Sequence, residues 1–166
     1  MIEILKTELS GVLLIKPFIF EDHRGDYVEI YNEREYKKRG ISTTFVQDDI
    51  STSKKDVLRG IHGDDITWKL ASCIFGKIYH VIVNCDIQSS DFGKWQAFIL
   101  SERNRHQILV PPKYGQGFLA LSNEITFHYK QSTYYDRARQ FTYKWNEPKF
   151  KIWWPNRMPI LSQRDR

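Results

Sequence analysis

Short runs of β-branched, aromatic and aliphatic residues recur along the chain, with turn-forming residues between them at intervals of about ten positions. This pattern is typical of an all-β sandwich or barrel. The runs predict ten strands, at residues 11–15, 27–31, 43–51, 57–61, 68–75, 77–83, 95–100, 107–110, 117–121 and 125–131. One helix is predicted at 33–39, with Asn32 as N-cap and Gly40 as C-terminal stop. So many strands favour a double-sheet jelly roll over an up-and-down barrel.

The chain length and the positions of the two cysteines indicate a single domain without disulfides. At 166 residues the chain has the length of one domain, and no linker, repeat or low-complexity segment divides it. We therefore expect residues 1–166 to form a single domain. Cys73 and Cys85 lie in apolar runs outside any metal-ligand spacing, so we expect both to be reduced and buried. Pro155 removes a backbone donor, so Trp153-Trp154-Pro155 is not expected to form a central strand.

The charged residues argue against two classes of partner. The net charge is +5, but the basic residues are scattered among acidic ones and form no stripe, so we expect no nucleic-acid partner. A phosphorylated small molecule explains the positive excess equally well. Residues 1–10 mix charged and apolar positions unlike a signal peptide, and no stretch approaches the length of a transmembrane helix. We therefore expect a cytoplasmic protein without a membrane partner.

The segment Arg59-Gly60-Ile61-His62, followed by Lys69, carries the first candidate chemistry. The turn-forming residues at 63–65 predict that His62 and Lys69 lie on neighbouring strands. An imidazole titrates near neutral pH and can take a carbon-bound proton, while a nearby ammonium can stabilise the enolate oxygen that develops. The alternative is that both residues are structural, and spacing alone does not decide between the two.

The remaining histidines do not form a metal site. None of the five histidines forms an HxH pair, and His62-Gly63-Asp64 lacks a third ligand of suitable spacing, so we predict no metal. His80 and His128 lie in strand patterns with apolar neighbours, where a hydrogen-bonded structural histidine is the favoured interpretation.

Other candidates carry weaker signals. Tyr129 lies near the end of the predicted strand at 125–131 and Tyr135 follows it. A phenol can donate a proton to a carbanion, but aromatic packing is the simpler explanation. Arg24, in a turn, and Arg59, between apolar residues, could each bind phosphate. The alternative for Arg24 is a solvent-facing turn residue, and the alternative for Arg59 is a charge paired with an acid. Asp165 looks like an ordinary residue of a solvated tail.

The order of motifs along the chain resembles the dTDP-4-dehydrorhamnose 3,5-epimerase family of cupin-fold sugar-nucleotide epimerases. The matching segments span nearly the whole chain and are 22–25 with Glu29, 45–48, 57–62, Lys69-Leu70, 92–95, 117–122, Tyr129-Lys130, Trp145-Asn146 and 161–165. The resemblance implies a cupin-like jelly roll that inverts C3, or C3 and C5, of a nucleotide-linked 4-keto-6-deoxy sugar for surface polysaccharides. It also implies a homodimer with an exchanged N-terminal strand, and neither cofactor nor metal.

The resemblance assigns roles to four residues in the reaction. It implies His62 as the general base, Asp165 as the partner that orients and charges its imidazole, Tyr129 as the acid on the opposite face, and Lys69 as the cation that stabilises the enolate. The residues that it implies for substrate binding are Arg24, Gln47 and Arg59 for pyrophosphate and sugar, Tyr135 for the base, and Glu29 and Gln116 as further contacts. Arg24 would serve the partner's site in such a dimer.

Two departures from the family pattern leave the substrate open. Gly115-Gln116-Gly117 stands where the family usually shows Ala-His-Gly, and Asn84-Cys85-Asp86 stands where it usually shows Asp-x-Arg. Residues 62–69 and 140–143 resemble a branch acting on GDP-linked 4-keto-6-deoxy-heptoses in capsule synthesis. The nucleotide, dTDP or GDP, and the number of inverted centres therefore stay open.

Two other functions remain as alternatives. The first is a cupin that binds a sugar nucleotide without turnover, against which the presence of both base and acid argues. The second is a 3,4-ketoisomerase, whose relatives resemble this chain poorly around Lys69 and Asp165.

Overall fold

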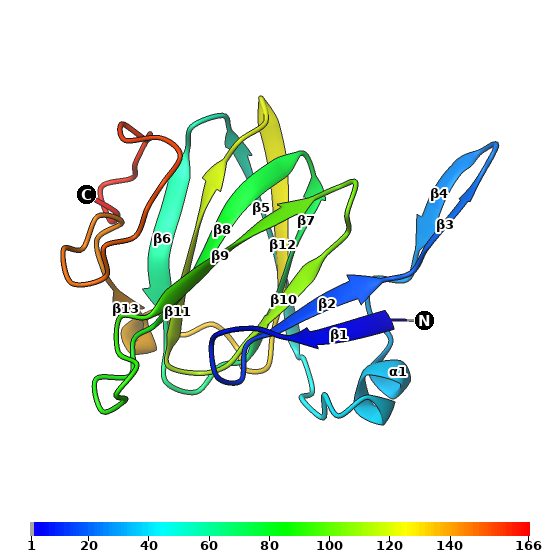
Figure 1. Ribbon diagram of the computed structural model, residues 1–166, viewed down its shortest axis with the longest axis horizontal. Coiled ribbons are helices and arrows are strands. Elements are labelled where there is room, and N and C mark those ends of the chain that lie inside the picture. The colour runs from blue at the N-terminus through cyan, green and yellow to red at the C-terminus, as the bar shows by residue number, and fades with distance from the viewer. Residues whose placement is uncertain (1) are drawn as a thin grey trace.

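Two antiparallel β-sheets form the body of the protein in the computed structural model, which describes residues 2–166 (Figure 1). The six-stranded sheet contains, in spatial order, β1 (Ile2–Lys6), β2 (Leu13–Pro17), β10 (Gln107–Val110), β7 (Lys69–Phe75), β12 (Glu124–Gln131) and β5 (Gln47–Lys54). The five-stranded sheet contains β13 (Phe141–Thr142), β6 (Leu58–Gly63), β11 (Tyr114–Ala120), β8 (Lys77–Asn84) and β9 (Trp95–Ser101). This arrangement confirms the predicted all-β jelly roll.

Helical structure is limited to α1 (Glu33–Lys38) and the 3₁₀ turn η1 (Arg137–Arg139) within residues 2–166. The Asn32 side chain accepts a hydrogen bond from the Glu35 amide, which confirms the predicted N-cap. No helix in the described part of the chain is long and apolar enough to cross a membrane.

A separate hairpin of β3 (Ile19–Asp22) and β4 (Gly25–Val28) projects away from the two sheets, at the end of the molecule opposite the C-terminus (Figure 1). Its turn contains Arg24, as the sequence predicted. Three aromatic residues in the hairpin or directly before it are more than half exposed: Phe18, Phe20 and Tyr27.

Each of the ten predicted strands overlaps an observed one, but three observed strands were missed. β1 is a short edge strand in which charged residues interrupt the apolar ones, and β13 contains only two residues. β3 has one partly buried residue and three exposed ones, so it lacks the buried face that produces a readable alternation. These strands depend on pairing with neighbours, which local patterning does not reveal.

The placement of β6 and β7 corrects the prediction that His62 and Lys69 lie on neighbouring strands. They follow each other in the chain, but β6 belongs to the five-stranded sheet and β7 to the six-stranded sheet. The residues between them cross from one sheet to the other instead of forming a hairpin. His62 and Lys69 therefore lie on opposite walls of the interior.

Apolar side chains fill one part of the space between the sheets and cover both outer faces. The interior cluster joins Ile78, Ile82 and Leu100 of the five-stranded sheet to Ile108 and Ile125 of the six-stranded sheet. The C-terminal segment places Phe150 and Trp154 against the outer face of the five-stranded sheet, and Tyr36 of α1 covers the other sheet. Both Cys73 and Cys85 are buried and free, as expected.

Close approach of β6 to β11 explains the glycine before His62. A Cβ on Gly60 would clash with the Gly117 Cα, and Gly60 has a φ of +121° that a residue with a side chain rarely adopts. The register of the two strands shifts between Gln116 and Phe118, next to this contact. The glycines thus allow a bulged pairing that places His62 opposite Gln116.

Candidate active site

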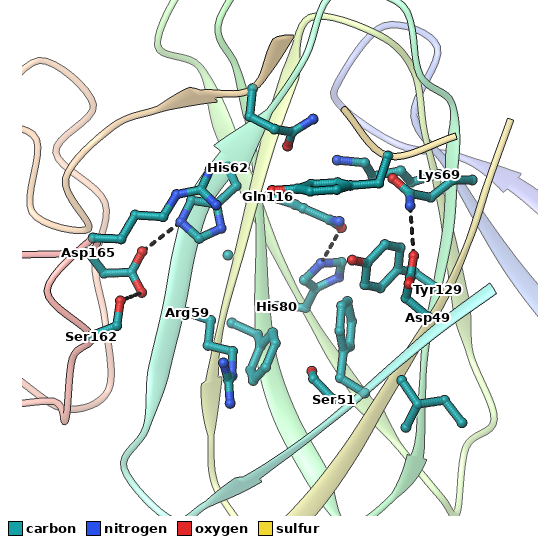
Figure 2. Close-up of a pocket in the computed structure, with 18 of the residues that line it drawn as sticks. Asp49, Ser51, Arg59, His62, Lys69, His80, Gln116, Tyr129, Ser162 and Asp165 are labelled. Atoms are coloured by element: carbon teal, nitrogen blue, oxygen red, sulfur yellow. Dashed lines mark hydrogen bonds and ion pairs between the residues drawn. The ribbon is translucent and has the colours of Figure 1, made fainter. Parts of the chain in front are cut away.

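A cavity of about 460 Å³ lies between the two sheets (Figure 2). Its size suits a small-molecule ligand. It is lined by β5, β7 and β12 on one side, by β6, β8 and β11 on the other, and by residues of the C-terminal segment. Eight of the ten candidate residues line it, namely Gln47, Arg59, His62, Lys69, Gln116, Tyr129, Tyr135 and Asp165.

His62 and Asp165 form a dyad at one end of the cavity. The His62 Nε2 lies 2.6 Å from the Asp165 Oδ1, although the two residues are 103 positions apart in the chain. An ionised carboxylate only accepts hydrogen bonds, so the imidazole donates its Nε2–H to Asp165. The other ring nitrogen, Nδ1, then carries a lone pair, which is the form that a general base requires.

Asp165 is held as a carboxylate despite its burial. Its side chain is almost completely buried, and burial alone would raise its pKa. Hydrogen bonds from His62 and from the Ser162 hydroxyl, 2.8 Å away, outweigh that effect and lower the pKa of Asp165 below its ordinary value. The C-terminal segment therefore presents a fixed negative charge behind the base.

Lys69 supplies a buried cation on the opposite wall. Burial lowers the pKa of Lys69, and the Asp64 carboxylate, 3.9 Å from its Nζ, opposes that effect. Asp64 is itself fixed by hydrogen bonds from the backbone amides of Ile66 and Thr67 and from the Gln140 side chain. The loop that crosses between the sheets thus holds a counter-ion beside Lys69.

Tyr129 projects from β12 into the cavity, on the wall opposite His62 (Figure 2). Burial, followed by the charge of Asp49, raises the pKa of Tyr129 to about 12. The phenol is therefore protonated at neutral pH and can donate a proton.

Asp49 lies directly opposite Tyr129 in the β5–β12 register. The amide groups of Gln47 and Gln131 each donate a hydrogen bond to its carboxylate, at 2.9 Å and 2.7 Å to Oδ2. These bonds fix a negative charge beside the phenol. Gln47 also accepts a hydrogen bond from the Tyr135 amide, which ties Tyr135 to the same network.

Arg59 extends from β6 toward β5 at the edge of the cavity. Its guanidinium donates to the Ser53 hydroxyl at 3.0 Å and to the Thr52 carbonyl oxygen at 3.1 Å. These bonds fix the orientation of a charged planar group that is suited to phosphate oxygens.

Arg24 and Glu29 lie outside the cavity. Arg24 is at the turn of the β3–β4 hairpin, with its side chain 80% exposed and paired to Asp22. Glu29 follows β4 and is exposed. Within one chain, Arg24 and Glu29 do not reach the cavity that the other eight candidate residues line.

The eight residues in the cavity combine a base, an acid and a cation. His62 and Tyr129 approach from opposite walls, so a planar group bound between them would meet the base on one face and the acid on the other. Lys69 provides positive charge where an enolate oxygen could develop. Such an arrangement can move a proton from one face of a carbon to the other. Within residues 2–166, no group of three or more His, Cys, Asp or Glu side chains is placed to hold a metal ion.

A family model described as dTDP-4-dehydrorhamnose 3,5-epimerase matches residues 6–166. The chain belongs to this epimerase family. The dTDP-4-dehydrorhamnose 3,5-epimerase of Salmonella typhimurium is 36% identical over 170 residues, which cover 99% of this chain and 93% of the relative. The dTDP-4-dehydrorhamnose 3-epimerase of Streptomyces niveus is 31% identical over 162 residues, which cover 95% of this chain and 78% of that protein.

A solved structure agrees with these sequence matches. The Legionella pneumophila dTDP-6-deoxy-D-glucose-3,5-epimerase, in complex with dTDP-4-keto-L-rhamnose, has a TM-score of 0.94 and 34% identity, covering 99% of this chain and 90% of that one. Membership of this family identifies the chain as an isomerase of the epimerase class. It does not favour the two alternatives, a binding cupin without turnover and a 3,4-ketoisomerase.

Sequence reasoning missed several residues that line the epimerase cavity, among them Asp49, Gln131, Gln140 and Arg164. Asp49 and Gln131 share a strand face with Gln47 and Tyr129, so strict alternation along β5 and β12 could have identified them. His80 was interpreted as a hydrogen-bonded structural residue, which is wrong in part. It lines the cavity, and its Nδ1 is buried without a partner within residues 2–166. His128 is buried and contacts the Ser72 hydroxyl, as its interpretation required.

Proposed function

We propose that the protein epimerises a nucleotide-linked 4-keto-6-deoxy sugar by moving a proton across the sugar ring. One observation carries the proposal: the His62–Asp165 dyad and the protonated Tyr129 approach one cavity from opposite walls, with Lys69 on the wall that carries Tyr129. A ketone at carbon 4 acidifies the protons on both neighbouring carbons. Stabilisation of the enolate is therefore the only other help that the base needs to remove one of them.

The reaction follows from these positions. The His62 Nδ1 takes the proton from carbon 3, and the electron pair moves into the ring so that negative charge develops on the carbon 4 oxygen. Lys69 stabilises that charge, while Asp165 stabilises the imidazolium that forms. Tyr129 then donates its phenolic proton to the opposite face of carbon 3, and solvent exchange returns the base and acid to their starting forms. Oxidation states are unchanged, so the reaction as written consumes no cofactor.

We assign the nucleotide end of the substrate to the arginine side of the cavity. Arg59 and Gln47 would hold the diphosphate and the sugar, and Tyr135, whose amide bonds Gln47, would stack on the base. Tyr135 is half exposed, which leaves its ring accessible to a ligand. We propose dTDP as the nucleotide because the relatives at 31% identity or more act on dTDP-linked sugars by name.

Solvent deuterium tests this function. Incubation with dTDP-4-keto-6-deoxyglucose in deuterated water should place deuterium at carbon 3, and NMR of the product shows whether carbon 5 is labelled as well. A GDP-linked 4-keto-6-deoxy-heptose in a parallel reaction distinguishes the two nucleotides. No label in either substrate would refute the proposed function, and label only in the GDP-linked sugar would refute dTDP.

We also propose that the active form is a homodimer in which Arg24 of one subunit enters the cavity of the other. The β3–β4 hairpin supports this arrangement, since it extends from the body and exposes Phe18, Phe20 and Tyr27 (Figure 1). Aromatic residues exposed together on one projecting element indicate an interaction surface. Within residues 2–166 the Arg24 guanidinium bonds only Asp22, through Nε and Nη2, so its Nη1 has no partner there. The side chain is 80% exposed and therefore accessible to a phosphate.

Subunit mixing tests the shared site. In a mixture of Arg24→Ala and His62→Ala subunits, each heterodimer has one cavity with both residues and one with neither, so activity should recover to about a quarter of the wild-type value after random exchange. If Arg24 acts within its own chain, every cavity in the mixture lacks one residue and activity does not recover. A monomer by analytical ultracentrifugation would also refute the proposal.

A further inference from the structure

His80 is a second histidine in the cavity wall, and neither the base nor the acid role accounts for it. It lies on β8, it is completely buried, and its Nε2 is 3.1 Å from the Gln116 Oε1 (Figure 2). Its ring packs against Phe127, with 5.4 Å between the ring centroids. A buried polar side chain next to a ligand cavity, with one nitrogen lacking a partner in residues 2–166, calls for an explanation.

The surroundings of His80 keep it neutral. Burial lowers its pKa to about 4, so the ring carries one proton at neutral pH. A proton on Nε2 can be donated to the Gln116 Oε1, whereas a proton on Nδ1 would be a buried donor without an acceptor. The hydrogen bond therefore favours the Nε2–H tautomer, with His80 as donor and the Gln116 carbonyl oxygen as acceptor.

This bond determines the orientation of the Gln116 carboxamide. Gln116 pairs with His62 in the β6–β11 register and lines the cavity between the two histidines. Because its oxygen faces His80, its amino group is directed elsewhere, and no acceptor contacts that group among residues 2–166. An oriented and unoccupied donor in a substrate cavity is suited to an oxygen of the ligand.

We propose that His80 is a positioning residue that fixes Gln116, so that the Gln116 amino group donates a hydrogen bond to a hydroxyl oxygen of the sugar beside the reacting carbon. The assignment rests on the proposed epimerase function. It gives the Gln116 carboxamide, which departs from the family pattern, a specific task. A neutral donor orients the sugar without adding a second acid or base near the reacting carbon.

Three single variants separate positioning from packing. Gln116→Met and His80→Met remove the hydrogen bond, while His80→Gln places an amide donor close to the position of the imidazole Nε2–H and serves as the conservative control. His80→Met and Gln116→Met should each raise KM about tenfold with a smaller change in kcat, as for one neutral hydrogen bond. His80→Gln should keep KM within about twofold of the wild-type value.

The double variant provides the decisive readout. If His80 acts through Gln116, adding His80→Met to Gln116→Met should change KM no further, because the group that it positions is already gone. A purely structural histidine would lower the melting temperature in both backgrounds without this dependence. A folded His80→Met protein with wild-type KM, or effects on KM that multiply in the double variant, would refute the proposal.

A measurement without substrate keeps this inference separate from the epimerase function. In ¹⁵N-labelled protein, His80, assigned by comparison with His80→Gln, should show the Nε2–H tautomer and no titration between pH 5.5 and 8.5. An Nδ1–H tautomer or a titration in that range would refute the positioning pair, even if the deuterium experiment succeeds. Failure of the deuterium experiment together with the expected tautomer would refute the epimerase function and the sugar contact but not the hydrogen-bonded pair.

Discussion

The two histidines of the cavity differ in their partners and in their exposure. His62 has a carboxylate partner and a side chain that is 26% exposed, whereas His80 has an amide partner and no exposed surface. A carboxylate stabilises the imidazolium, so His62 can accept a proton during the reaction. A neutral amide in a buried site does not compensate for desolvation of a charged ring, so His80 is confined to hydrogen bonding. The surroundings of the ring therefore decide which histidine is a base.

The largest expected effect tests whether His80 can replace the base. His62→Ala should reduce both inversion and deuterium incorporation about 10⁴-fold, at the upper end of what a general base contributes. His80 should not rescue the variant, because its low pKa makes it a poor proton acceptor. NMR of the substrate in deuterated water measures both quantities.

The contrary result for this variant is specific. Incorporation that persists in His62→Ala and is lost on adding His80→Gln would mean that His80 is a base, which would remove the distinction between the two histidines. His128→Gln is the matched control, since it alters a buried histidine that does not line the cavity.

The acid should be equally irreplaceable. Tyr129→Phe should slow inversion about 10³-fold while leaving proton removal by His62 nearly intact, since the variant lacks only the donor on the opposite face. Deuterium should therefore return to the original configuration more often than it produces the epimer. Equal losses of inversion and incorporation in this variant and in His62→Ala would mean that the acid and base are misassigned.

Replacing the carboxylate behind His62 makes its surroundings resemble those of His80. Asp165→Asn should lower kcat about 10³-fold, because an amide can donate to Nε2 and move the ring proton to Nδ1, where the lone pair is needed. Ser162→Ala is the control, since it removes one hydrogen bond to Asp165 but keeps the charge, and it should cost less than about tenfold. A wild-type rate in Asp165→Asn would show that the amide serves the base as well as the carboxylate does.

Local patterning predicted much of the fold but not the relation between its two sheets. Alternation and turn residues located β6 and β7, because each strand has its own apolar residues. The same signals did not show that the turn residues at 63–65 belong to a crossing between sheets, since a hairpin and a crossover can use the same residue types. Which walls His62 and Lys69 occupy is therefore a tertiary property.

The two histidine sites show the same limit in the prediction of function. Asp165 is 103 residues from His62 and looked like part of a solvated tail, so only the family resemblance assigned it to the dyad. His80 lies among apolar neighbours in the sequence, and this pattern did not predict its contact with Gln116 on another strand. Residue spacing identifies groups that share a strand face, but it does not identify partners on a neighbouring strand or in a segment far along the chain.

Acid unfolding should separate the two sites by pH. The unfolded state protonates His80 with a pKa near 6.5, whereas the folded state does so only near pH 4, so the unfolded state binds more protons between these values. Stability should fall as pH falls through this window, by up to roughly 3 kcal/mol at about 1.4 kcal/mol per pKa unit. His80→Gln lacks this component and should lose correspondingly less stability in urea unfolding between pH 7 and pH 4.5.

The pKa of Asp165 is lowered from 3.8, so its stabilisation is complete above that value and is lost only as pH falls further. Ser162→Ala weakens the hydrogen bonding of Asp165 but keeps the carboxylate beside His62, so it should retain the wild-type pH dependence above pH 4.5. The same loss of pH dependence in Ser162→Ala and His80→Gln would contradict the assignment of this window to the buried, neutral His80.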